Sequence, residues 1–321
     1  MRVSHHDLQT FVASAANAVG LPSAQAERLA QLLTDNDLRG VFSHGTRQIA
    51  TYARLMRDGV LNAAPKPFTV QETPASLLLD GDGGLGYFPA YEGTLKLIEK
   101  VKQNTIGVLL TRNHGHFGAA GLYSRLTLEH DMLAFVTSGV QLNLTPGDPL
   151  YHAAGGSPMS FSAPTLEEDP LVLDFGTMHD LYDNSPYRDE IAQKAPGLVL
   201  RAIGMGEVCQ AWGGLLAGVP IDEAHNPKTF KGANQGSMVI AFKIALFAEP
   251  EAFKREMDTY VRTVRGLTPL PGFDETYLPG GVEAARERRY REEGIPVGAE
   301  HRETLTILAT ELGIDVPWSA H

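Results

Sequence analysis

The stretch Thr111-Arg-Asn-His-Gly-His-Phe-Gly118 places two histidines and two glycines where a predicted strand gives way to a predicted helix. Residues 106–110 are an uninterrupted apolar run, which predicts a buried strand, and residues 119–130 predict a helix. In α/β proteins the crevice at such a junction is open to ligands. The change from strand to helix predicts α/β structure. Because histidine exchanges a proton near neutral pH, the two histidines also predict a functional site at this loop.

Ser43-His-Gly45 forms a second histidine loop much earlier in the chain. One such loop is better explained by helix capping or by bridging of backbone groups, whereas two in one chain make a catalytic site an equal alternative. His114 and His116 are two positions apart, so we expect one ring to face the site and the other the interior. A third ligand at a spacing typical of zinc is lacking, so the sequence predicts no metal site.

Composition narrows the class of protein. The 321 residues are 43% hydrophobic and 20% charged, as in globular domains. A net charge of −11 argues against nucleic-acid and anionic-membrane partners. The single cysteine, Cys209, excludes an internal disulfide, and we expect it to be a buried, inert thiol. With neither a signal peptide nor a long apolar span predicted, the expected location is the cytoplasm.

The order of predicted elements divides the chain into two parts. Apolar residues at helical spacing predict three helices before residue 59, and further helices at residues 250–266, 282–293 and 300–312. Strands, helices and loops alternate between about residues 76 and 175, and residues 199–218 predict a buried helix. We therefore expect a helical domain of residues 1–72 and 243–321, whose two segments pack together around a central α/β domain of residues 73–242.

Gly81, Gly83 and Gly86 match the G-x-G-x-x-G pattern of dinucleotide-binding loops, after a predicted strand and before a predicted helix. The next strand, however, ends in Thr111-Arg112 and supplies no acidic residue for a ribose hydroxyl, and Phe88-Pro89 crowd the helix start. A plain glycine-rich turn is the preferred interpretation.

The sequence resembles the malate/L-lactate dehydrogenase family that is unrelated to the Rossmann-fold lactate and malate dehydrogenases. This family includes ureidoglycolate and sulfolactate dehydrogenases, diketogulonate reductase and piperideine-2-carboxylate reductases. The resemblance covers nearly the whole chain. It is carried by Asp37-Leu-Arg-Gly-Val-Phe-Ser-His-Gly45, Tyr52, Gly59-Val-Leu-Asn62, Asp80-Gly-Asp82, Gly86, Asn113-His-Gly-His-Phe-Gly-Ala-Ala-Gly121, Tyr123, Leu173-Asp174, Asn234-Gln-Gly236, Phe253, Pro279-Gly280 and Gly294-Ile295.

The resemblance implies a non-Rossmann α/β fold of the L-sulfolactate dehydrogenase type, with a mixed central sheet that binds the cofactor. It also implies an oxidoreductase that transfers hydride between NAD or NADP and a small 2-oxo or 2-hydroxy acid, or a cyclic imino acid. The implied assembly is a homodimer with the active site at the subunit interface, where the helical domain contributes to substrate binding and dimerisation.

The family also implies roles for individual residues of this chain. His116 is the implied general acid/base, with His44 and Ser43 beside it in the catalytic group. The implied substrate-binding residues are Arg47, Tyr52 and Asn113, and the implied cofactor-binding residues are His44, Asn113, Gly118, Thr137, Ser157, Pro158 and Asp174. Asp174 ends a predicted strand, where it either orients a histidine or caps the next segment.

Departures from the family pattern lie around the cofactor and the substrate carboxylate. Position 48 is Gln where the family has Arg, and the neighbouring Arg47 would point about 100° away on a helix. Gly156-Ser-Pro158 replaces Gly-Thr-Asn-Pro, Met205-Gly-Glu-Val-Cys209 replaces Lys-Gly-Tyr-Gly-Leu, and residues 175–203 are shorter than their family counterpart. These changes suit either a dehydrogenase with altered contacts or a cofactor-independent lyase, hydratase or isomerase that uses His44 and His116. A ligand-binding relative without catalysis is the third alternative.

Overall fold

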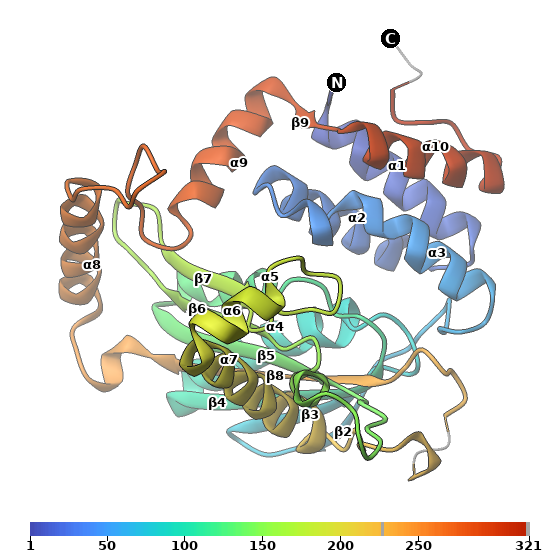
Figure 1. Cartoon of the computed structure of the whole chain (residues 1–321), viewed down its shortest axis with the longest axis horizontal. Helices are drawn as coiled ribbons and strands as arrows, with labels where there is room; N and C mark the ends of the chain where they lie inside the picture. The colour runs from blue at the N-terminus through green and yellow to red at the C-terminus, as the bar shows by residue number, and fades with distance from the viewer. Residues whose placement is uncertain (226–227, 319–321) are drawn as a thin grey trace.

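The computed structural model of the chain describes residues 1–225 and 228–318, which form a mixed sheet and a separate group of helices beside it (Figure 1). Seven strands make up the sheet in the order β2-β3-β4-β8-β5-β6-β7. They are β2 (Phe68–Glu72), β3 (Ser76–Asp80), β4 (Ile106–His114), β5 (Met132–Val140), β6 (Pro158–Ala163), β7 (Leu171–Gly176) and β8 (Gln235–Lys243). Only β3 and β4 run parallel; the other neighbouring strands are antiparallel.

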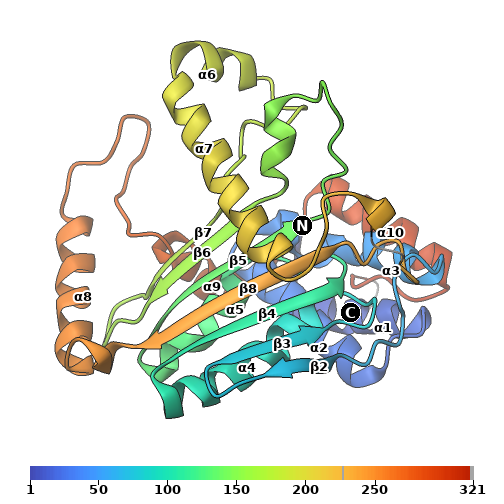
Figure 2. The ribbon, with the colours of Figure 1, turned by 90° about the horizontal axis from the view of Figure 1, so that it is seen from below.

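Helices cover both faces of the sheet (Figure 2). Helix α4 (Tyr87–Asn104) connects β3 to β4, and Gly93 lets it approach Leu79 and Leu109. Helix α7 (Pro196–Cys209) continues into a π-helical turn, Gln210–Leu215, which packs on β5 from the opposite face. Small residues allow this second contact, because a Cβ atom on Gly139 would lie 2.4 Å from the Gly214 nitrogen.

Both ends of the chain contribute to the helical group. It contains α1 (His5–Ala18), α2 (Ser23–Leu38), α3 (Ile49–Arg57), α9 (Gly281–Glu293) and α10 (Ala299–Leu312). Strand β1 (Arg2–Val3) pairs with β9 (Ile295–Pro296), which brings the two ends together. Strand β2 lies within residues 1–72, which were assigned to the helical domain, and it pairs with β3 at the edge of the sheet.

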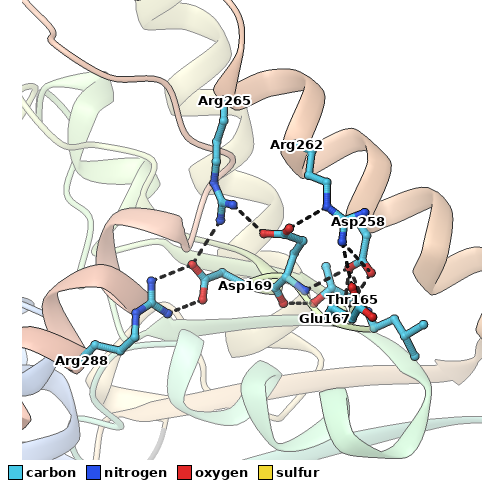
Figure 3. A network of polar contacts seen from close by, with 9 residues as sticks. Thr165, Glu167, Asp169, Asp258, Arg262, Arg265 and Arg288 are labelled. Carbon is cyan, nitrogen blue, oxygen red and sulfur yellow. Dashed lines mark hydrogen bonds and ion pairs between the residues drawn. The ribbon is translucent and has the colours of Figure 1, made fainter.

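Helix α8 (Pro250–Arg265) stands apart from the other terminal helices, beyond the connection between β6 and β7 (Figure 1). Asp258 is buried, and its carboxylate accepts hydrogen bonds from the backbone nitrogens of Leu166, Glu167 and Glu168. Asp169 forms ion pairs with Arg265 of α8 and Arg288 of α9 (Figure 3). This polar network, and not an apolar core shared with α1, holds α8 in place.

Three predicted segments differ from the structure. Residues 119–130 form the short α5 (Gly121–Ser124) and a 3-10 helix, Arg125–His130, instead of one regular helix. Residues 180–195, for which no helix or strand was predicted, contain α6 (Arg188–Lys194). The helix predicted as buried at residues 199–218 covers the sheet with one face only, and its other face exposes Leu198, Met205, Val208, Trp212, Leu215 and Leu216. Periodicity cannot distinguish such a surface helix from a buried one when its outer face is apolar.

The glycine-rich turn at residues 81–86 packs against its surroundings. A Cβ atom would meet His114 at Gly81, Phe230 at Gly83, and His114 and Phe117 at Gly86. The first residues of α4, which include Tyr87 and Phe88, are buried. These close contacts are compatible with the preferred interpretation of a plain glycine-rich turn, and Gly83 also lines a polar cavity with Arg112 and Asn113. Within the described residues, none of the helices combines the length and apolarity that crossing a bilayer requires.

Candidate active site

The two histidine loops meet in space although more than sixty residues separate them. The ring centroids of His44 and His116 are 5.4 Å apart. Both rings line a pocket of about 520 Å³, together with Ser43, and the volume lies in the range of small-molecule sites. This pocket opens between the helical group and the ends of β4, β5 and β7, where the sequence placed a site.

His114 and His116 differ in surroundings as their spacing predicted. His114 is fully buried, and its ring bonds to the Thr111 hydroxyl at 2.7 Å and the Gly115 carbonyl oxygen at 2.7 Å. His116 is only partly buried and lines the pocket. His114 thus shapes the loop from inside, while His116 is available to a ligand.

Two buried tyrosines support His116 from behind. The Tyr52 hydroxyl lies 2.6 Å from His116 Nδ1, and the Tyr87 hydroxyl lies 3.2 Å from that of Tyr52. Tyr52, predicted to bind substrate, therefore sits behind His116 and outside the pocket lining. Gly118, in the left-handed region at φ +83°, leaves room for Tyr87, because a Cβ there would meet the tyrosine ring at 2.5 Å.

The Ser43–His44 loop is held at its side chains and its backbone. Ser43 Oγ lies 2.9 Å from His44 Nδ1, and Asn36 Nδ2 donates to the His44 carbonyl oxygen at 2.9 Å. The Ser43 contact occupies Nδ1 of His44, and the Tyr52 contact occupies Nδ1 of His116. Within the described residues, Nε2 of each ring has no hydrogen-bond partner.

Burial governs the titration of both rings. Loss of hydration, and to a lesser extent the charges of His44 and His114, lowers the pKa of His116 to about 4. Burial also lowers the pKa of His44. Both rings are therefore neutral at physiological pH in the open pocket, which is the form that accepts a proton.

The opposite side of the pocket is made largely of glycine and serine. Gly118, Ser157, Pro158 and Asp174, all predicted to contact a cofactor, line the pocket beside Gly139 and Gly156. Asp174 accepts a hydrogen bond from the Gly121 nitrogen at 2.9 Å. Although its side chain keeps contact with solvent, the surrounding protein displaces enough water to raise the pKa of Asp174 to about 6. This bond is made to the first residue of α5, an earlier part of the chain, and matches neither of the two roles considered for Asp174.

Three other predicted residues lie away from the pocket lining. Arg47 pairs with Glu300 of α10 at 2.7 Å, because position 47 turns it away from the histidines. The Asn113 amide donates to Asp80 at 2.7 Å and lines a separate polar cavity with Arg112. Thr137 is buried, and its hydroxyl donates to the Pro158 carbonyl oxygen at 2.8 Å, so it supports the pocket wall from behind.

Several lining residues were not predicted. Gln235 belongs to the Asn234-Gln-Gly236 stretch that carried the resemblance, yet no role was given to it. Gln210 comes from the π-helical turn, where it accepts a hydrogen bond from the Val140 nitrogen at 2.9 Å. His179 and Tyr182 come from the segment that departs from the family pattern. The sequence offered no signal for these last three.

Comparison with known proteins agrees with this geometry. Residues 3–179 and 199–306 match the malate/L-lactate dehydrogenase family. L-sulfolactate dehydrogenase from Methanocaldococcus jannaschii is 28% identical over 92% of this chain and 93% of its own. Ureidoglycolate dehydrogenase (NAD(+)) from Escherichia coli K12 is 24% identical over 92% and 93%. The solved structure of malate dehydrogenase from Pyrococcus horikoshii superposes with a TM-score of 0.84 at 24% identity, covering 98% of this chain and 97% of that one.

The chain therefore belongs to the malate/L-lactate dehydrogenase family and is an oxidoreductase by class. The likeness to the solved malate dehydrogenase confirms the expected non-Rossmann α/β fold. Residues 180–198 fall outside the match to the family, within the segment 175–203 that the sequence singled out as different.

Proposed function

We propose that the pocket binds NAD or NADP together with a small 2-hydroxy or 2-oxo acid, or a cyclic imino acid, and catalyses hydride transfer between the two. One observation carries the proposal: His116 lines the pocket beside His44 while Tyr52 engages its Nδ1 atom. This leaves His116 Nε2 as the nitrogen available to a substrate oxygen. The relatives are named for malate, sulfolactate and ureidoglycolate, which supports the hydroxy acid class for this chain.

The proton transfers follow from the chemistry of the substrate. In the oxidative direction His116 Nε2 takes the hydroxyl proton, and in the reductive direction it returns a proton to the carbonyl oxygen, where negative charge develops. A pKa of about 4 keeps His116 neutral and ready to accept a proton at physiological pH. A bound carboxylate next to the ring favours its protonated form, which suits the return step. Ser43 and His44 are placed to hydrogen-bond the acid.

The opposite wall fits a dinucleotide. Its glycines allow backbone groups to approach a ligand closely, and the pocket surface is mostly apolar with a few polar groups. His44, Gly118, Ser157, Pro158 and Asp174 would hold the cofactor, which supplies or accepts the hydride when bound. Among the described residues, the lining contains neither lysine nor arginine. This favours NAD, since arginine commonly accommodates the 2′-phosphate of NADP.

Calorimetric titration with NADH and NADPH tests the proposal directly. We expect NADH to bind in the micromolar range and to support reduction of at least one acid in a panel of small 2-oxo and cyclic imino acids. His116→Gln should retain NADH binding but lose turnover. Absence of binding by either dinucleotide at millimolar concentration would overturn the proposal. The cofactor-independent alternative is not favoured, because the relatives are named dehydrogenases.

We also infer a homodimer with the pocket near the subunit interface. The exposed apolar residues of α7 and its following turn, including Met205, Trp212 and Leu216, support an interface there. Analytical ultracentrifugation should give twice the chain mass, and Leu216→Glu should shift the protein towards monomer.

The buried, unpaired Cys209 supports a reducing, cytoplasmic location, which fractionation of the native cells would test.

A further inference from the structure

The Ser43–His44 loop is closed from beneath by a side chain at the end of α2. Asp37 is fully buried, and its Oδ2 accepts hydrogen bonds from the Thr46 backbone nitrogen at 3.0 Å and the Thr46 hydroxyl at 2.5 Å. These bonds join the residues before and after Ser43-His44. Since Asn36 also holds the His44 carbonyl oxygen, the loop is fixed at both ends and in its middle.

The glycine of the Ser-His-Gly motif makes this closure possible. A Cβ atom at position 45 would lie 1.6 Å from Asp37 Oδ1, so the carboxylate occupies the space of a side chain. Any other residue at position 45 would displace either Asp37 or the loop. Gly45 is therefore required by the contact with Asp37, since its φ of −90° is open to any residue.

A distant helix completes the arrangement. The Thr46 hydroxyl gives its hydrogen to Asp37 and so accepts one from His301 Nε2 of α10, 3.0 Å away. Burial lowers the pKa of His301 to about 4, which keeps the ring neutral. Burial acts in the opposite direction on Asp37. Loss of hydration raises the pKa of Asp37 to about 7, although the two hydrogen bonds from Thr46 act to lower it. The charge of Arg47 acts to lower the pKa of both groups, and that of Glu300 acts to raise the pKa of His301.

We propose that Asp37, Thr46 and His301 form a buried clamp that positions His44 for the reaction at His116, an inference that rests on the proposed function. All three lie outside the pocket lining, so they act through the loop as positioning residues. A displacement of about 1 Å in an active site can cost about 10²-fold in rate. The clamp thus couples the carboxyl-terminal helix to the catalytic loop across 255 residues of sequence.

Replacing Thr46 by valine or serine tests the clamp with a matched pair. Thr46→Val keeps the shape but removes the hydroxyl that joins Asp37 to His301, whereas Thr46→Ser retains it. We expect kcat to fall about 10²-fold in Thr46→Val and to remain within about twofold in Thr46→Ser. Thr94→Val is the control, because Thr94 is a buried threonine of α4 whose hydroxyl bonds only within its helix.

A second readout does not depend on turnover. NMR titration of the histidine rings, with His44 assigned from His44→Gln, gives the pKa of His44 in each variant. In Thr46→Val that pKa should rise towards the ordinary value of about 6.5, because a loosened loop hydrates the ring. Thr46→Ser and Thr94→Val should leave it unchanged. If Thr46→Val matched Thr94→Val in both kcat and His44 titration, the clamp would be overturned.

Two further arms keep the test decisive. Should Thr46→Val fail to fold, His301→Phe cuts the same chain of hydrogen bonds from α10 and is judged by the same titration. A wild-type protein without turnover on any acid would refute the proposed function, while the titration of His44 would still decide the clamp.

Discussion

The two sides of the pocket are built on different principles. The catalytic wall, which we define as Ser43, His44 and His116, is held by side-chain hydrogen bonds from Tyr52, Asn36 and within the loop itself. The glycine-rich wall is defined as Gly139, Gly156, Ser157 and Asp174. Within it, Gly139 packs against the turn after α7, and the Ser157 hydroxyl donates to the Gly206 carbonyl oxygen of α7.

This difference explains most departures of the chain from its family, although Gln48, which replaces Arg, donates to the Ser43 carbonyl oxygen beside the catalytic wall. Side chains that move a proton are fixed by partners of specific chemistry, so a change of any one partner disturbs the reaction. A wall of backbone and small side chains is shaped by its neighbours and accepts new ones, such as Met205-Gly-Glu-Val-Cys209 in α7. We therefore propose that proton transfer depends on the catalytic wall alone, whereas cofactor affinity depends mainly on the glycine-rich wall, and four predictions test that separation.

The largest effect is expected at His116. His116→Gln removes the titrating nitrogen while keeping a polar side chain, and kcat should fall by about 10²–10⁴-fold, the usual contribution of general acid–base catalysis. Steady-state kinetics and calorimetry measure the loss of turnover beside retained NADH binding. His152→Gln is the control, because His152 is exposed and pairs with Asp183 away from the pocket. Turnover that survived in His116→Gln would remove the catalytic wall from the mechanism.

Tyr52→Phe should have the next largest effect. It deletes the hydrogen bond to His116 Nδ1, and a net value of about 1 kcal/mol for such a bond predicts a roughly fivefold to tenfold lower kcat. Tyr87→Phe, one step further from His116, should cost less. Steady-state kinetics measures kcat and the KM for the cofactor in both variants. We expect kcat to fall while the KM for the cofactor stays constant, because the glycine-rich wall is unchanged. Equal losses in the two variants would argue that packing, and not the bond to His116, is responsible.

The pH dependence of the two directions should be opposite. A histidine whose pKa is lowered to about 4 is a base above that pH, so kcat/KM for oxidation should rise through pH 4 and then level off. The reductive rate needs the protonated ring and should fall as the pH rises. Initial rates in both directions over pH 4–9 measure this. A reductive rate that increased with pH would exclude His116 as the proton donor.

The smallest effect on kcat is expected at Asp174, on the glycine-rich wall. Asp174→Asn keeps an acceptor for the Gly121 nitrogen, so the fold should persist. It removes the negative charge that would strengthen a hydrogen bond to the cofactor, and the affinity for NADH should therefore fall about 10-fold or more. Calorimetry gives the affinity, and saturating NADH should restore kcat. If kcat remained low at saturation, the glycine-rich wall would take part in the chemistry and the separation would fail.

The catalytic wall was predictable from the sequence to a greater extent than the rest. Ser43, His44 and His116 stand in short motifs whose residue types state their chemistry, and His114 was expected inside. Arg47 and Asn113 were placed less well, because one residue of helical register or one bend at φ 52° decides where a side chain points. Gln210 gave no signal, since its role arises only from the approach of the π-helical turn to β5.

The sequence by itself determined most of the strands and helices, the alternation that makes the chain α/β, and the two histidine loops. Local patterns suffice for these, because periodicity and loop composition act over a few residues. Only the tertiary structure decided that His44 and His116 face one another and that His301 contacts Thr46. It also decided that α8 lies away from the other terminal helices, held by ion pairs to the connection between β6 and β7. Such contacts join residues 72 to 255 positions apart, and packing of whole elements, not local preference, sets which of them meet.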